Sequence, residues 1–115
     1  MTQSSQESRR ARRKPVNIAA EVIDAISGRR MGQLGNLSAS GMLLIGHDAP
    51  RNEAIYQLSL PLPGLGDTPT SIEVGVQEQW HEDAATPGQV WAGYRIIAIG
   101  DEAAVQLQRW LDLPD

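Results

Sequence analysis

Hydrophobic and polar residues alternate along most of this chain, with the period of two that is typical of half-buried β-strands. The alternation starts over residues 16–22, and Ser27-Gly28 then predicts a turn. Beyond the turn, Met31 and Leu34 continue the apolar phase on the returning segment. The first part of the chain therefore predicts a pair of strands joined by a tight turn.

Four further apolar segments predict strands at residues 42–45, 55–60, 72–80 and 90–99. The loops between them are polar or rich in Pro and Gly, over residues 47–52, 61–69 and 81–88. In the segment 72–80, the alternation places on one face Ile72, Val74, Val76, Glu78 and Trp80. Glu78 is the exception on this otherwise apolar face.

The pattern changes to a helical period near the C-terminus. Asp101 is placed to cap a helix that runs to about Leu111, with Ala104 and Leu107 on the same stripe, and Pro114 ends it. About six short strands followed by one amphipathic helix predict an all-β fold with one C-terminal α-helix. The expected architecture is a six-stranded antiparallel β-barrel with the helix on its mouth or flank.

Length and composition limit the kind of protein. A chain of 115 residues is the size of a single domain, and it contains no Cys, which excludes disulfides, thiolate zinc sites and cysteine nucleophiles. It has no run of 18 apolar residues, so we expect no membrane insertion. The basic N-terminal residues are not followed by an apolar stretch, so they do not form a secretory signal, and we expect a cytoplasmic protein.

The net charge of −4 is divided unevenly. Residues 1–14, which we call the basic arm, carry a net charge of +4, whereas residues 15–115 carry −8. We expect the first residues of the arm to be disordered in the free protein and residues 15–115 to form the barrel with its helix. An acidic body would repel a long polyanion, which argues against nucleic-acid binding.

The basic arm contains a cluster of four arginines, Arg9, Arg10, Arg12 and Arg13. A guanidinium group binds phosphate through two parallel hydrogen bonds and pairs with the O6 and N7 edge of guanine. Taken alone, such a cluster is more often a solvated basic tail than a binding site.

A second segment of interest is Asn36-Leu37-Ser38-Ala39-Ser40-Gly41. On a strand, the side chains of Asn36 and Ser38 would lie on one face, and both can donate and accept hydrogen bonds. Gly41 suits a position with positive φ or a close approach of another group. The alternative interpretation is an ordinary turn between two strands, since Asn, Ser and Gly are common turn residues.

In this order and spacing, the two segments resemble the motifs of the PilZ domain family, Arg-x-x-x-Arg and (Asp or Asn)-x-Ser-x-x-Gly. Here these residues are Arg9 and Arg13, then Asn36, Ser38 and Gly41. The resemblance covers nearly the whole chain, and it implies a six-stranded barrel that binds the bacterial second messenger cyclic di-GMP.

The resemblance also implies roles for individual residues. Arg9 and Arg13 would clamp the ligand, with Arg10 and Arg12 in support. Asn36 and Ser38 would contact a guanine, and Gly41 would shape the turn.

Two positions make the resemblance less complete. Asn36 stands where many members of the family have Asp, so we expect weaker binding at most. Trp80 lies near the place where some members have an aromatic residue beside the ligand, and a core or barrel-rim tryptophan is an equal alternative.

Other chemistry is poorly supported. His81-Glu82-Asp83 lacks a second His at helical spacing, so we expect no metal site, and no catalytic set is present. We therefore expect a receptor without enzymatic activity and without a cofactor, as a monomer or homodimer. Ligand binding would order the arm and signal to an effector protein that the sequence does not identify.

Two other functions compete with this one. The first is a PilZ-like protein-interaction module that does not depend on nucleotide and acts in motility, through pili or flagella. The second is a nucleic-acid binder, against which the acidic body and the lack of Phe argue.

Overall fold

The computed structural model describes residues 13–16, 19–67 and 69–114 of the chain. Arg9, Arg10 and Arg12 of the predicted site, and Ile18 of the first predicted strand, lie outside the described residues. At the start of the chain the alternation predicted one strand, whereas the described residues form two, β1 and β2. In full, the elements are β1 (Lys14–Pro15), β2 (Glu21–Asp24), β3 (Arg30–Leu37), β4 (Gly41–Gly46), β5 (Ile55–Pro61), β6 (Ser71–Asp83), β7 (Val90–Ile99) and α2 (Asp101–Leu111).

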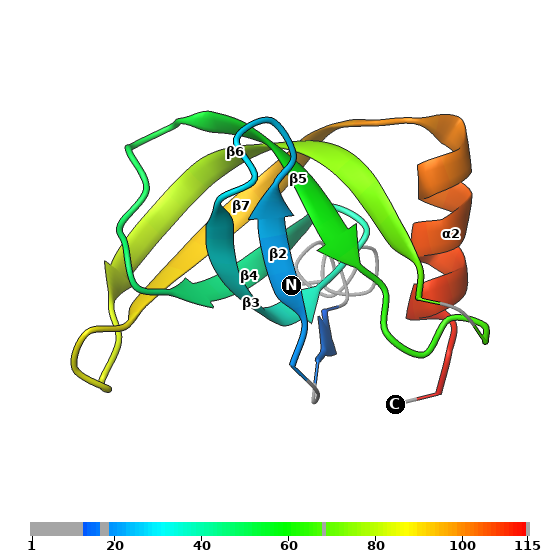
Figure 1. The fold of residues 1–115 in the computed structure, drawn as a ribbon, viewed down its shortest axis with the longest axis horizontal. Coiled ribbons are helices and arrows are strands. Elements are labelled where there is room, and N and C mark those ends of the chain that lie inside the picture. Colours follow the sequence, from blue (N-terminus) through cyan, green and yellow to red (C-terminus); the bar gives the residue numbers. More distant parts are fainter. Residues whose placement is uncertain (1–12, 17–18, 68, 115) are drawn as a thin grey trace, which may run out of the picture.

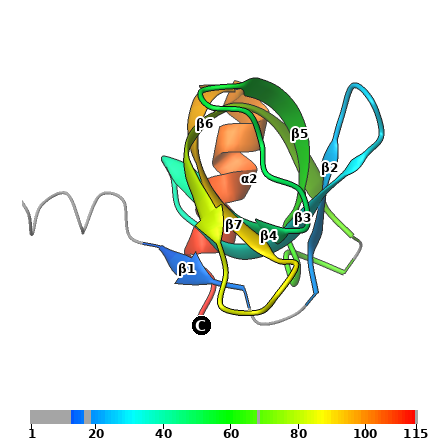
Figure 2. The same ribbon diagram turned by 90° about the vertical axis from the view of Figure 1, so that its left-hand side faces the viewer.

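Six of the strands close into an antiparallel barrel. Following hydrogen-bonded neighbours, the order is β2, β3, β4, β7, β6 and β5, and β5 pairs again with β2. The short strand β1 pairs with β3 along the same edge as β2, closer to the β3–β4 turn (Figures 1 and 2). The predicted six-stranded antiparallel barrel with one C-terminal helix is confirmed.

The inward-facing side chains of each strand fill the barrel interior, together with one face of α2. Apolar residues at alternating positions on the strands face this interior because closing the barrel removes their surface from water. The buried apolar residues are Ala20, Val22, Leu34, Leu37, Met42, Leu44, Leu58, Leu60, Leu62, Ile72, Val74, Val76, Ala92, Tyr94, Leu107 and Trp110.

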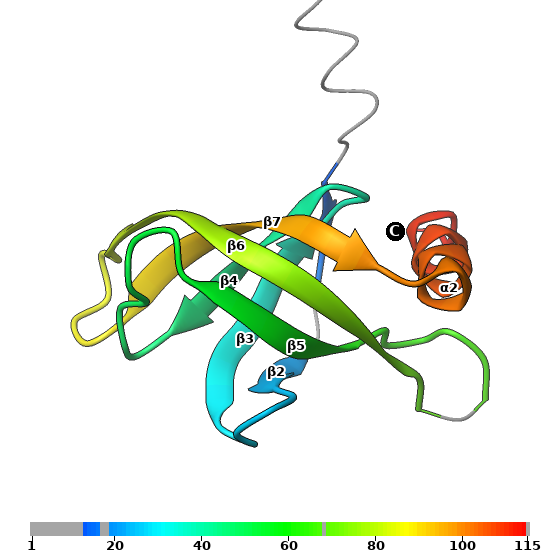
Figure 3. The same ribbon diagram turned by 90° about the horizontal axis from the view of Figure 1, so that it is seen from above.

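The two ends of the barrel differ. At one end, which we call the helix end, α2 stands across the opening beside the loop that follows β5 (Figures 1 and 3). At the other, which we call the open end, lie the β2–β3 turn and the loops over residues 47–54 and 84–89. The turn between β3 and β4 and the strand β1 belong to the helix end, because β3 and β4 run antiparallel with Leu37 opposite Met42.

Two details of the predicted elements are wrong. The strand β2 begins at Glu21 rather than near residue 16, because the chain first pairs with the end of β3 at Lys14–Pro15. Pro15 has no N–H to donate, which keeps β1 short. The cap residue of α2 is Gly100, without a side-chain bond, and Asp101 is the first residue of the helix itself. In that position the Asp101 carboxylate still faces the positive end of the helix dipole.

Candidate ligand-binding site

The turn between β3 and β4 is held by Ser38. Its Oγ accepts hydrogen bonds from the backbone N–H groups of Ser40 (3.2 Å) and Gly41 (3.1 Å). Its own N–H donates to the carbonyl oxygen of Gly41 at 2.9 Å. Ser38 is fully buried, so its hydroxyl replaces backbone partners inside the turn. A direct contact of Ser38 with a ligand stays a prediction.

The alternation that was expected to place Asn36 and Ser38 on one face ends before it reaches Ser38. β3 stops at Leu37, and its register against β4 shifts between Leu34 and Asn36. Asn36 is only partly buried and bonds at the surface, whereas Ser38 lies inside. The expectation of a shared face is therefore wrong, because a strand's period does not extend into the turn that follows it.

Gly41 is required by a close approach of two strands. A Cβ atom at this position would collide with the carbonyl oxygen of Tyr94 on β7. Gly41 is not among the residues with positive φ. Of the two reasons for glycine considered from the sequence, the structure supports close approach.

The two sequence motifs meet at the surface of the helix end. Nη1 of Arg13 donates a hydrogen bond to Oδ1 of Asn36 at 2.9 Å. The pairing of β1 with β3 makes this contact possible, because it places Pro15 opposite Asn36. Residues 23 positions apart are thus adjacent in space. Arg13, the only arginine of the basic arm within the described residues, contacts the segment that contains Asn36.

Lys14 connects the same segment to the helix. Its Nζ donates to the carbonyl oxygens of Trp110 (2.8 Å) and Leu113 (2.7 Å), and it lies 4.5 Å from the centroid of the Trp110 ring. A cation at the C-terminus of a helix satisfies free carbonyl groups and complements the helix dipole. Neighbouring residues of β1 therefore contact both the candidate site and α2.

A continuous row of residues crosses the outer surface from Asn36. Strand register places Asn36 opposite Leu43, Leu43 opposite Gly93, and Gly93 opposite Trp80. The neighbours of Leu43 and Gly93 along their strands are buried in the core, so this row faces outward. Four strands at the usual spacing make the row about 14 Å long.

Trp80 lies at the far end of this row and is 45% exposed. A Cβ atom on Gly93 would collide with its indole Nε1, so the indole rests directly on the backbone of β7. The prediction that Trp80 shares the inward face of Ile72 and Val76 is wrong. A register shift between Glu78 and Trp80 reverses the phase of β6 at this point.

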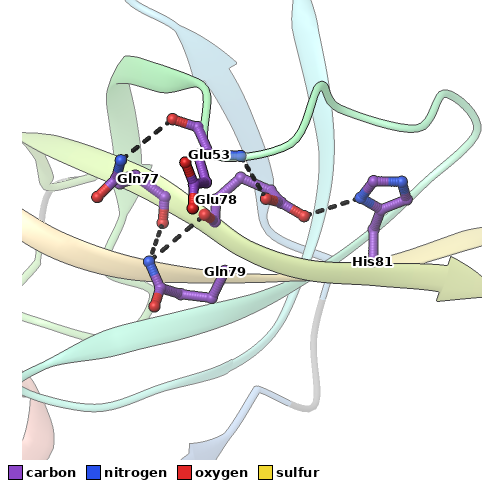
Figure 4. A network of polar contacts seen from close by, with 5 residues as sticks. All are labelled: Glu53, Gln77, Glu78, Gln79 and His81. Atoms are coloured by element: carbon purple, nitrogen blue, oxygen red, sulfur yellow. Dashed lines mark hydrogen bonds and ion pairs between the residues drawn. The ribbon is translucent and has the colours of Figure 1, made fainter.

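Glu78, the acidic residue noted on the inward face of β6, forms a polar network that the sequence did not reveal (Figure 4). It is only 2% exposed. Its Oε1 accepts the backbone N–H of Glu53, and its Oε2 lies 2.8 Å from Nδ1 of His81. Gln77 adds a bond to the carbonyl oxygen of Glu53. The network fastens the loop over residues 47–54 to β6, next to Trp80.

The pKa of Glu78 reflects this network. Burial on its own would raise the pKa, but the N–H of Glu53 and the side chain of His81 stabilise the carboxylate and hold its pKa below the ordinary value of 4.5. Glu53 adopts a φ of 60°, which is unusual for a residue with a side chain. Backbone strain in the loop is thus offset by the bond that Glu53 donates to Glu78.

Neither a metal site nor a membrane-spanning helix is found in the described part of the chain. No group of three His, Cys, Asp or Glu residues there is arranged to hold a metal ion. None of the helices described is long and apolar enough to cross a bilayer.

The closed six-stranded barrel with its C-terminal helix defines a small protein of PilZ-like fold. No family model matches the chain, and no curated protein matches it. Among solved structures, the chain is similar to the inhibitor of motility MotI/DgrA from Bacillus subtilis, with a TM-score of 0.68 and 15% sequence identity. The match covers 86% of this chain and 47% of the other, so this chain spans about half the length of that protein.

Proposed function

We propose that this protein is a receptor for cyclic di-GMP that binds the ligand on the outer surface of the barrel, between Arg13 and Trp80. The observation that carries the proposal is the hydrogen bond between Arg13 and Asn36. It brings together one residue from each of the two motifs whose combination resembles the PilZ family. The sequence alone offered these motifs in a suggestive order and spacing, without a contact between them.

The chemistry of the surface suits a ligand with bases and phosphates. Arg13 offers a planar guanidinium at one end of the row, and the exposed indole of Trp80 offers a stacking surface at the other. Gly93 between them has no side chain, which lets the indole of Trp80 lie directly on the backbone of β7. Arg95, on the adjacent row opposite Gly41, adds an exposed cation.

The expected role of the arm also finds support in β1. Ordering a residue costs about 1–2 kcal/mol of backbone entropy, so a long free arm is expensive to fix on a ligand. Pairing of Lys14–Pro15 with β3 anchors the arm's last residues beside Asn36 before any ligand arrives. A bound ligand then has to order only the arginines that precede this anchored segment.

The contacts of Lys14 suggest how binding reaches a partner. Arg13 faces the proposed ligand, and Lys14, the next residue, holds the C-terminal carbonyl groups of α2. Tightening of the arm around a ligand would therefore change the surface formed by β1 and the end of α2. We propose this joint surface as the one that an effector protein recognises through its different affinity for the two states.

The test is calorimetric titration of the protein with cyclic di-GMP, with GMP as the control ligand. Saturable binding is expected, and Arg13→Ala should weaken it about tenfold or more, since a charge-assisted hydrogen bond is lost. Arg109→Ala is the matched control, because Arg109 is an exposed arginine on α2 away from the row. Stoichiometry distinguishes one bound ligand per chain from two.

No heat of binding at high protein concentration would overturn the proposal, as would equal losses in Arg13→Ala and Arg109→Ala. The mechanism has a separate test by NMR. If the amide signals of residues 9–13 are as mobile with saturating ligand as without it, the arm does not act as a clamp.

A second function is favoured by one finding, the likeness of the fold to that of an inhibitor of motility. In this alternative the barrel is a protein-interaction module that acts in motility and does not need nucleotide. Failure of every cyclic di-GMP titration, together with a motility defect on deletion that Arg13→Ala does not reproduce, would favour it.

A further inference from the structure

The open end of the barrel contains a cavity of about 740 Å³, far from Arg13 and Asn36. Its walls come from the β2–β3 turn, the facing ends of β3 and β4, and the loop over residues 47–51. Tyr56 and Tyr94 border it from the barrel interior. Sites for small molecules in proteins have volumes of roughly 300–1,000 Å³, so this cavity is of suitable size.

The hydroxyl of Tyr94 is the first sign of a ligand. The residue is only 4% exposed, and its hydroxyl makes no hydrogen bond to any other described residue. Yet no side-chain oxygen or nitrogen in the described chain is both fully buried and unpartnered. The hydroxyl must therefore reach open space, and the cavity is the space that Tyr94 borders.

Tyr94 is held in place for this role. The ring of Tyr56 packs edge-on against it, with 6.1 Å between centroids. Burial, reinforced by Tyr56 and Glu78, raises the pKa of Tyr94 well above its ordinary value of 10, so it remains a neutral hydroxyl that can donate. A donor that reaches the cavity without a partner in the protein is available to a ligand that offers an acceptor.

Three acids and three arginines line the cavity, and two of the acids already have partners within the protein. Among the acids, Glu21 pairs with Arg30 at 3.3 Å, and Oδ1 of Asp24 already accepts the N–H groups of Ile26 and Ser27. Burial alone would raise the pKa of Asp24. The two backbone N–H groups and the charge of Arg29 outweigh this effect and lower the pKa.

The loop over residues 47–51 adds a further cation, Arg51. Its guanidinium makes no ion pair or hydrogen bond with another described residue, and Asp48 on the same loop is the third acid that lines the cavity. His47 lies against the carbonyl oxygen of Gly88 through Nδ1, so that nitrogen carries a proton. Arg29 on the β2–β3 turn and Arg51 on the loop over residues 47–51, together with the tyrosine hydroxyl, match a phosphate or carboxylate with a polar body.

We propose that this cavity is a second binding site, for a small anionic ligand whose phosphate or carboxylate group contacts Arg51 and Arg29. An acceptor atom of the same ligand takes the hydrogen bond of the Tyr94 hydroxyl. The site is distinct from the proposed cyclic di-GMP surface, since none of the residues that line the cavity belongs to the row from Asn36 to Trp80.

The test is an NMR titration of the full chain with three probes: pyrophosphate, GMP and citrate. Arg13→Ala is used as the background so that binding at the other surface is weakened. Shifts in the amides of Gly46, Asp48 and Arg51 are expected to saturate with at least one probe. The preferred probe distinguishes a phosphate ligand, with or without a base, from a carboxylate.

Two variants then examine the assigned contacts. Arg51→Gln should weaken the best probe about tenfold, because a charge-assisted bond is lost. Tyr94→Phe should weaken it by about threefold to tenfold, the range for a neutral hydrogen bond, and leave the fold intact, since the hydroxyl has no partner to lose. Arg109→Gln on α2 is the control and should leave affinity unchanged.

The proposal fails if none of the three probes shifts these amides at about 10 mM, a concentration that would reveal even millimolar affinity. It also fails if Arg51→Gln and Arg109→Gln weaken binding equally, since that would indicate attraction by overall charge alone.

Discussion

The helix end and the open end of this barrel are built on the same six strands but filled with different chemistry. At the helix end, Leu107 and Trp110 of α2 are each 3% exposed, and the Trp110 Nε1–H bonds to the carbonyl oxygen of Pro63. At the open end, Tyr94 and Glu78 occupy the interior beside a cavity with charged walls. Apolar packing seals one end, and polar groups are left accessible at the other.

The difference arises gradually along the strands. On β5 the inward residues change from Leu60 and Leu58 to Tyr56, and the facing residues of β6 are Ile72, Val74 and Val76. One inward step further along β6 stands Glu78. We therefore expect the helix end to contribute most of the stability. The open end keeps polar groups that a requirement for stability alone would not place there.

The largest effect on stability is expected where α2 packs on the helix end of the barrel. Trp110→Ala should lower the free energy of unfolding by about 3–5 kcal/mol, because a buried ring is replaced by a cavity and the bond to Pro63 is lost. Urea unfolding followed by circular dichroism measures it. Trp91→Ala is the control, since Trp91 is 39% exposed, and its cost should be less than half as large. Similar costs for the two would show that α2 does not dominate stability.

A smaller effect, still at the helix end, is expected at the β3–β4 turn. Gly41→Ala should cost about 2–3 kcal/mol, because its Cβ would meet the backbone oxygen of Tyr94, which cannot move aside. Gly93→Ala should cost about 1 kcal/mol or less, since the partly exposed indole of Trp80 can swing away. Thermal unfolding ranks the two variants, and tryptophan fluorescence should change only in Gly93→Ala. The reverse ranking would contradict this account.

The polar network of the open end should contribute less, and in a manner that depends on pH. Glu78→Gln should cost about 1–2 kcal/mol near neutral pH, because the amide replaces the charged acceptor of the Glu53 N–H. The folded pKa of Glu78 lies below its ordinary value of 4.5, so the carboxylate's contribution is present above that pH and is lost as pH falls through the folded pKa.

The difference in stability between the wild type and Glu78→Gln should therefore shrink on acidification below about pH 4.5. Glu73→Gln, an exposed position on the same strand, is the control and should show a difference near zero throughout. A gap that widens in acid would mean that the pKa of Glu78 is raised in the folded protein.

The smallest change in stability is expected at the cavity. Tyr94→Phe should alter the free energy of unfolding by less than about 0.5 kcal/mol, because the hydroxyl has no partner among the described residues. Denaturant unfolding of the two proteins in parallel measures it. A loss above about 1.5 kcal/mol would reveal a hydrogen bond within the protein and would leave no free donor for a ligand.

Local patterns predicted much of this fold because their periods depend only on neighbouring residues. The turn at Ser27-Gly28, the strand over residues 55–60 and the helix ending near Leu111 all follow the expected periods. Prediction failed where a period was interrupted. The phase of β6 reverses at the shift before Trp80, and nothing in the order of residues there announces it.

The sequence by itself determined the order of strands and helix, the unequal charges of arm and body, and the two motifs that together suggested a ligand. Only the tertiary structure decided which distant residues meet: Arg13 with Asn36, Lys14 with the end of α2, and Glu53 with Glu78. It also decided that Ser38 is inside a turn and that Tyr94 borders a cavity. The physical reason is that alternation and helical period are local properties, whereas contacts across a closed barrel depend on strand register, which bulges and loop lengths set for the whole ring at once.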